Sequence, residues 1–185
     1  LCKYIAKLLS IPMGVLPTAP SMDGYLSTGS ALIINKMKVT EMVLMPEDIL
    51  IDLDILASSP REMIIAGYGD IIGKFTALAD WRLANIYNGE KINQESYDMM
   101  ARALKNTISN IEKGDPFSKD SIECLIDALN TAGIAMAVAG NSRPASGSEH
   151  HISHFLEIHF INNNLPPVLH GIKVGLGCLV TVYLY

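Results

Sequence analysis

The chain has 185 residues, a mass of 20.1 kDa, 49% hydrophobic and 18% charged residues, and a net charge of -5. This composition excludes a disordered chain and predicts a well-buried core. The acidic balance, with a pI near 5.5, provides no basic field for nucleic acid or an anionic membrane. We therefore expect neither a nucleic-acid partner nor a membrane.

The cysteines and the apolar runs indicate a cytoplasmic protein. Cys2, Cys124 and Cys178 are too few and too widely spaced for a disulfide framework or a CxxC metal site, so we expect reduced, buried thiols. The first residues do not match a secretory signal. No uncharged run is longer than Ala128–Ser142, which is too short for a membrane-spanning helix. Because the chain starts at Leu1 within an expected helix and finishes on an apolar run, we expect an internal segment of a longer protein.

The pattern of residues 1–58 predicts the end of an α/β nucleotide-binding domain. We expect a helix over 1–9, a short strand over 11–16, a loop over 18–30 and a hairpin with strands over 31–35 and 41–45. A further strand is expected over 49–56, where isoleucine and leucine alternate with Asp52 and Asp54.

Residues 59–185 predict an all-helical unit, which we expect to be incomplete at its C-terminus. Ser59-Pro60-Arg61-Glu62 matches a capping box that opens a helix to about Ala84. Further helices are expected over 94–112, over 118–139 and from near Ser148 to about Phe160, and strand-like alternation is confined to the final residues. Residues expected to be buried in the first of these helices are Ile64, Ile65, Tyr68, Ile72, Phe75 and Leu78.

Histidines gather in SGSEHHISH at 146–154. His150 and His154 are four residues apart and therefore share one face of a helix, whereas His151 points away from that face. Such a pair can offer two imidazoles to one ion or one substrate. The alternative is a polar surface helix that carries histidines by chance.

Asp70 lies within AGYGDIIGK, where Gly67, Gly69 and Gly73 interrupt a helix at a cost of about 1 kcal/mol each relative to alanine. Such glycines indicate that a backbone or a ligand approaches closely. A buried carboxylate in that groove needs a metal or a cationic partner. Lys74, four residues on, is the alternative partner, as an ordinary ion pair within the helix.

His170 follows the rigid Pro166-Pro167 step and precedes Gly171. One carboxylate and two imidazoles from separate elements would leave coordination positions open for a substrate. This is the ligand set of a catalytic divalent site, for which zinc or a neighbouring first-row metal is the natural occupant.

Two further segments carry polar groups suited to ligands. The loop PTAPSMDGYLS offers hydroxyls at Thr18, Ser21 and Ser27 and a carboxylate at Asp23, at the end of an expected strand where α/β sheets bind ligands. Arg143 lies beside a helix start and suits a phosphate or a carboxylate. The alternatives are a plain turn for the loop and a surface position for the arginine.

Together these motifs resemble the glycerol-1-phosphate dehydrogenase family of the iron-containing alcohol dehydrogenase and glycerol dehydrogenase superfamily. The matching strings are VLPTAPSMDGYLSTGSALI, AGYGDIIGKFTALADWRL, GNSRPASGSEHHISHFLE and LHGIKVGLG. The resemblance implies a dehydroquinate synthase-like fold, in which the end of an NAD(P)-binding α/β domain (1–58) precedes a helical metal- and substrate-binding domain (59–185). It also implies reversible reduction of dihydroxyacetone phosphate to sn-glycerol 1-phosphate, a step in phospholipid metabolism.

The resemblance also assigns roles to individual residues. The metal ligands would be Asp70, His150 and His170, with Asp70 and His154 as catalytic residues. Substrate would contact Asp23, Asp70 and His154, and our own chemical inference adds Arg143 for the phosphate. The nicotinamide side would be lined by Thr18, Ala19, Pro20, Ser21 and Ser27. The choice between His150 and His151 depends on the spacing to His154.

The expected cofactors are a divalent metal (zinc, nickel or iron) and NAD(H) or NADP(H), in a homo-oligomer. The superfamily's glycine-rich pyrophosphate loop would lie upstream of Leu1, so we expect the 185-residue segment alone to be nearly inactive. Two alternatives stay open: a glycerol or other polyol dehydrogenase on the same scaffold, and a non-catalytic metal-binding fragment. A dehydroquinate synthase-like lyase is disfavoured because that family is expected to carry Glu where Asp70 stands.

Overall fold

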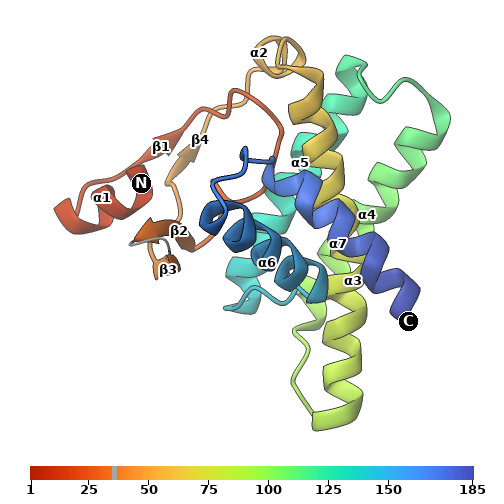
Figure 1. Cartoon of the computed structure of the whole chain (residues 1–185). Coiled ribbons are helices and arrows are strands. Elements are labelled where there is room, and N and C mark those ends of the chain that lie inside the picture. Colours follow the sequence, from red (N-terminus) through yellow and green to blue (C-terminus); the bar gives the residue numbers. More distant parts are fainter. Residues whose placement is uncertain (35–36) are drawn as a thin grey trace.

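The computed structural model describes residues 1–34 and 37–185. Its strands and first helix form an arm beside a bundle of longer helices (Figure 1). The elements in chain order are α1 (Cys2–Leu9), β1 (Gly14–Val15), β2 (Gly29–Ile34), β3 (Met37–Met42), β4 (Asp48–Ile49), α2 (Leu53–Ala57), α3 (Arg61–Asn88), α4 (Gln94–Lys113), α5 (Lys119–Ala139), α6 (Ser148–Asn162) and α7 (His170–Leu184).

The strands form two small sheets. β1 pairs in parallel with β4, with Gly14 opposite Asp48, and β2 pairs antiparallel with β3, with Gly29 opposite Met42. The expected hairpin is therefore present, but its second strand begins at Met37 rather than at residue 41. Asn35, the end of the first expected strand, lies outside the described residues.

The strand expected over 49–56 is wrong beyond its first residue. The Asp52 carboxylate accepts hydrogen bonds from the backbone N–H groups of Asp54 at 2.9 Å and Ile55 at 3.1 Å. It therefore caps the N-terminus of α2, and Asp54 lies in the first turn of that helix. The apparent alternation of acidic and apolar residues marks a helix start.

The expected capping box at the start of α3 is also wrong. The Ser59 hydroxyl donates to the Leu56 carbonyl at 2.7 Å, so it belongs to the end of α2. Pro60 holds the N-cap position with φ -53° and makes no side-chain cap bond. α3 extends past the expected Ala84 to Asn88 and ends at Gly89, whose φ of 74° is in the left-handed region.

The hydrophobic core lies between α3, α4 and α5, where Ile64, Trp81, Met100, Leu125 and Leu129 are buried together. By length and composition, α5 is the one described helix apolar enough to cross a membrane, which the uncharged run alone did not indicate. The most apolar stretch of α5 is 50% buried inside the protein. Its buried side chains form part of the hydrophobic core.

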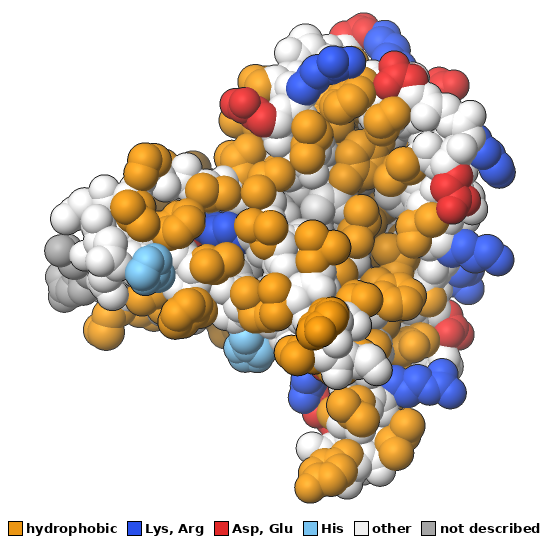
Figure 2. Space-filling model, turned by 45° about the vertical axis from the view of Figure 1, so that its right-hand side comes forward, with side chains coloured by type: hydrophobic (Ala, Val, Ile, Leu, Met, Phe, Trp, Pro, Cys, Tyr) orange, Lys and Arg blue, Asp and Glu red, His pale blue; other side chains and the backbone are white. Residues whose placement is uncertain are grey.

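The burial expected for Ile65, Ile72 and Phe75 is wrong, since their exposed fractions are 47%, 40% and 58%. α3 packs on α4 and α5 along one side and on α7 along another, and the side toward α7 is formed by glycines and buried charged groups. These larger apolar side chains therefore face outward. Figure 2 shows that hydrophobic side chains cover much of one face of the molecule.

α7 is a helix, whereas the final residues suggested strand-like alternation. It packs closely along α3, because a Cβ atom on Gly69 would lie 2.3 Å from the Gly171 carbonyl oxygen. A Cβ atom on Gly171 would lie 1.8 Å from the carbonyl oxygen of Ala66. The prediction that the glycines of α3 allow a close backbone approach is confirmed for Gly67 and Gly69, whereas Gly73 faces the side chains of Val174 and Glu149.

Candidate metal centre

Asp70, His150 and His170 come from α3, α6 and α7 and meet at one point. One ligand atom from each lies within 4.8 Å of the others. Nε2 of His150 is 3.8 Å from Oδ1 of Asp70, and the His150 and His170 ring centroids are 5.3 Å apart. Two nitrogens and one oxygen at this spacing suit a divalent ion such as zinc, whose bonds to such atoms are about 2.0–2.2 Å long.

The contact between α3 and α7 brings two of these residues together. Gly69, whose missing side chain admits the backbone of Gly171, directly precedes Asp70. Gly171 directly follows His170, which is the first residue of α7. The same backbone contact therefore brings the carboxylate and the imidazole to one place.

A buried ammonium group lies beside the cluster. Nζ of Lys74 is 2.7 Å from Oδ1 of Asp70 and 2.7 Å from Oδ2 of Asp23. The backbone N–H of Asp23 donates to the other Asp70 oxygen at 2.9 Å. The ion pair that was the alternative explanation for Asp70 is thus present, and it coexists with the cluster. The sequence did not reveal that Lys74 also binds Asp23.

These contacts determine the protonation states of Asp70, Lys74 and Asp23. Burial opposes ionisation of Asp70, but Lys74, His170 and His150 lower the pKa of Asp70 to about 2. Burial also opposes charge on Lys74, yet the two carboxylates raise the pKa of Lys74 above its ordinary value. Burial and the Asp70 charge raise the pKa of Asp23. Lys74 therefore stays cationic and Asp70 anionic, which suits a ligand for a metal ion.

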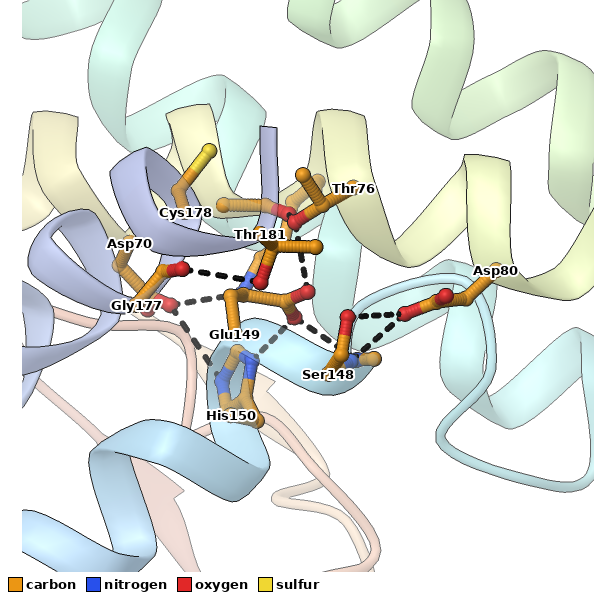
Figure 3. Close-up of polar contacts among 12 residues, drawn as sticks. Asp70, Thr76, Asp80, Ser148, Glu149, His150, Gly177, Cys178 and Thr181 are labelled. Atoms are coloured by element: carbon orange, nitrogen blue, oxygen red, sulfur yellow. Dashed lines mark hydrogen bonds and ion pairs between the residues drawn. The ribbon is translucent and has the colours of Figure 1, made fainter. Parts of the chain in front are cut away.

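Glu149 is a completely buried acid that sequence reasoning left without a role. Oε1 of Glu149 lies 2.7 Å from Nδ1 of His150 and accepts the Gly147 backbone N–H at 2.7 Å, and Oε2 accepts the Thr76 hydroxyl at 2.6 Å. Burial opposes its ionisation, but these hydrogen bonds and the charge of His150 lower the pKa of Glu149. Figure 3 shows the carboxylate between α3, α6 and α7, above the His150 ring.

The start of α6 is fixed to α3 by a second acid. Oδ2 of Asp80 accepts the backbone N–H of Ser148 at 2.6 Å and the Ser148 hydroxyl at 2.7 Å (Figure 3). A Cβ atom on Gly147 would lie 2.5 Å from the same oxygen, so glycine suits this position. Asp80 thereby acts as a cap from another helix and sets the position of Glu149 and His150.

A cavity of about 300 Å³ opens onto the cluster. Its lining includes Asp23, Ser27, His150, His154, Glu157 and His170. His154 lies one turn after His150, with ring centroids 6.2 Å apart. Of the adjacent histidines, His150 is buried and faces Asp70, whereas His151 is exposed. The geometry therefore favours His150 over His151 as a ligand.

The other predicted residues lie at different distances from this cavity. Ser27 lines it and also a neighbouring cavity of about 500 Å³. Thr18, Ala19, Pro20 and Ser21 line neither of these two cavities, and the Pro20 carbonyl instead packs against Gly67.

Arg143 makes a bidentate pair with Glu90 and is not among the residues that line either cavity. Its Nε and Nη2 donate to the two carboxylate oxygens at 2.6 and 2.5 Å. This pairing could not be predicted from the sequence, because Arg143 and Glu90 lie on separate loops.

The profile of the iron-containing alcohol dehydrogenase family matches residues 1–60. The chain is 37% identical over 183 residues to glycerol-1-phosphate dehydrogenase [NAD(P)+] of Bacillus licheniformis, covering 99% of this chain and 46% of that protein. It is 36% identical over 187 residues to the protein of the same name in Hyperthermus butylicus, covering 100% and 52%. The chain thus spans about half the length of the curated relatives it matches.

Solved structures confirm the expected fold. Glycerol dehydrogenase from Schizosaccharomyces pombe matches with a TM-score of 0.77 and 24% identity, over 98% of this chain and 47% of that one. A probable glycerol dehydrogenase from Sinorhizobium meliloti matches with a TM-score of 0.73 and 16% identity, over 96% and 51%. The short strands followed by a helical bundle are therefore the arrangement that these dehydrogenases share.

Proposed function

Because this chain belongs to the iron-containing alcohol dehydrogenase family, we propose that it supplies the metal- and substrate-binding part of an NAD(P)-dependent oxidoreductase. The proposed reaction interconverts dihydroxyacetone phosphate and sn-glycerol 1-phosphate. The identity of about 37% to glycerol-1-phosphate dehydrogenases over nearly the whole chain supports this choice of substrate.

The observation that carries the proposal is the meeting of Asp70, His150 and His170 at the cavity. The donor set fits a divalent ion of the zinc, nickel or iron class, because it combines one anionic oxygen with two imidazoles. When bound, such an ion polarises a ketone oxygen, and the nicotinamide of NADH or NADPH supplies the hydride.

The residues of the chain then have separate tasks. Asp70 is held in place by Lys74 and by the backbone of Asp23, so its position is fixed before any ligand arrives. Asp23 and His154 line the cavity and are proposed to contact the substrate. His154 is also the proposed proton carrier for the alcohol oxygen, since imidazole titrates near neutral pH.

The cofactor and phosphate assignments are also proposals. Residues 18–21 and Ser27 are proposed to face the nicotinamide, and the neighbouring cavity that Ser27 lines supports this placement for Ser27. Arg143 is proposed as a phosphate contact only if its guanidinium leaves Glu90 when the substrate binds. We further propose a cytoplasmic, homo-oligomeric enzyme.

The test is reduction of dihydroxyacetone phosphate by the protein that contains this chain, with NADH or NADPH and added Zn²⁺, Ni²⁺ or Fe²⁺. Unphosphorylated dihydroxyacetone serves as the matched substrate. A strong preference for the phosphate, lost in Asp70→Asn, would support the proposal. Preference for the free ketone would instead indicate a polyol dehydrogenase, and no reaction with either substrate would indicate a non-catalytic metal-binding protein.

A further inference from the structure

Glu149 is buried completely, and every described polar contact of its carboxylate comes from a group able to donate a proton. The backbone N–H of Gly147 can only donate, so Oε1 is an acceptor in that contact. Nδ1 of His150 lies 2.7 Å from the same oxygen. The Thr76 hydroxyl donates to Oε2 at 2.6 Å.

From these contacts we infer that Glu149 is a positioning residue, which keeps the proton of the His150 ring on Nδ1 and leaves the lone pair of Nε2 facing Asp70 and His170. The inference rests on the proposed metal centre and deepens it. A neutral imidazole carries one proton, and its position is set by the hydrogen bond that the second ring nitrogen makes. Nε2 lies on the Asp70 side, 3.8 Å from Oδ1.

The packing around Glu149 shows that its position is built by three helices. A Cβ atom on Gly177 of α7 would lie 2.4 Å from the carbonyl oxygen of Glu149. A Cβ atom on Gly73 of α3 would lie 3.2 Å from Cγ of Glu149. Larger residues at these two positions would displace the acid. Thr76, one turn after Gly73, completes the enclosure with its hydroxyl.

This arrangement has a chemical consequence for the ion. A histidine whose far nitrogen donates to a carboxylate is held in one ring orientation and is a more basic ligand. Loss of such a partner typically lowers metal affinity about 10- to 100-fold. Glu149 is not among the residues that line the cavity, and none of its described hydrogen bonds goes to Asp70 or His170, so its effect passes through His150.

The experiment uses the full chain and two measurements that need no enzyme activity. ¹⁵N NMR of the metal-free chain at alkaline pH reports which nitrogen of His150 carries the proton, with His150→Asn for assignment. Competition with a chromophoric chelator reports the affinity for Zn²⁺. The variants are Glu149→Ala, which removes the acceptor, and Glu149→Gln, which keeps an acceptor oxygen but removes the charge. The control is Glu62→Ala, at an exposed position.

We expect the proton on Nδ1 in the wild-type chain and in Glu149→Gln, and a mixture of tautomers in Glu149→Ala. Zn²⁺ affinity should fall about 10- to 100-fold in Glu149→Ala, should fall less in Glu149→Gln and should not change in Glu62→Ala. A wild-type ring protonated on Nε2 would overturn the inference, as would wild-type Zn²⁺ affinity in Glu149→Ala.

Two outcomes separate this inference from the proposed function. A chain with the proton on Nδ1 that binds no Zn²⁺ would uphold the role of Glu149 in orienting His150 and would refute the metal centre. If Glu149→Ala does not fold, the wild-type tautomer decides, and a wild-type ring protonated on Nε2 would overturn the inference.

Discussion

Nζ of Lys74 lies 2.7 Å from Oδ1 of Asp70, and both side chains are completely buried. The same nitrogen reaches Asp23 at 2.7 Å, so one cation is shared by two carboxylates. When both acids are ionised, the two carboxylates and one ammonium group carry a net negative charge. That charge favours a divalent cation in the adjacent cluster, and Lys74 limits the repulsion between the acids when no ion is bound.

Lys74→Met should destabilise the fold strongly, because it leaves two buried carboxylates without a cation. Removing one partner of a buried ion pair typically costs about 3–5 kcal/mol. Urea unfolding of the metal-free chain measures the change. The control is Lys119→Met, whose partner Asp54 is exposed, and there we expect little change. Equal effects of the two substitutions would show that Lys74 does not stabilise the acids.

His150→Ala and His151→Ala should differ sharply in metal affinity although the two residues are adjacent. His150 is buried and faces Asp70, whereas His151 is exposed. His150→Ala removes a direct ligand, so Zn²⁺ affinity should fall by more than about 100-fold, which exceeds the effect of losing a residue that only hydrogen-bonds a ligand. His151→Ala should leave Zn²⁺ affinity unchanged. Chelator competition gives both values. A loss in His151→Ala instead would identify that residue as the ligand.

Gly69→Ala should loosen the contact between α3 and α7, because the new Cβ atom would lie 2.3 Å from the Gly171 carbonyl oxygen. Overpacking of this kind typically costs about 1–3 kcal/mol. Because Asp70 and His170 flank the contact, Zn²⁺ affinity should fall as well. Gly114→Ala is the control, since a Cβ atom there meets open space. Thermal unfolding with and without Zn²⁺ checks both effects, and equal behaviour of the two variants would contradict the prediction.

Stability should fall at alkaline pH as Tyr68 ionises. Its hydroxyl donates to the Pro116 carbonyl at 2.8 Å, and burial raises the pKa of Tyr68 to about 12. A raised pKa in the folded state favours folding below the unfolded value of about 10, and that contribution is lost as pH rises from about 10 to about 12. Urea unfolding across this range should show a shallower decline in Tyr68→Phe. An unchanged slope would rule out Tyr68 as a source of the decline.

Much of the helical part could be predicted from the sequence, because the signals for α4 and α5 are local. Asn93 and Ser118 each accept a hydrogen bond at a helix start, and the apolar spacing between such caps fixes each helix within one or two residues. The glycines around Asp70 likewise indicated that another backbone approaches closely. They did not indicate which segment of the chain supplies that backbone.

What the sequence could not reveal depends on partners far apart in the chain. The exposure of Phe75 follows from the packing of α7 along a different side of α3, more than ninety residues later in the chain. The acceptor role of Glu149 needs Thr76, 73 positions earlier. The pairing of Arg143 with Glu90 spans 53 positions. Periodicity and spacing carry no information about such contacts, whereas the residue types at Asp70, His150 and His170 did suggest a shared site.

The three proposed ligands lie on three helices, and only the folded chain brings them together. An ion that binds the folded state alone shifts the folding equilibrium by mass action, by about 2.7 kcal/mol when its free concentration is 100 times the dissociation constant. Metal supply and the amount of folded protein would then rise and fall together. In a cell short of the ion, both the folded fraction of the protein and its activity would decrease.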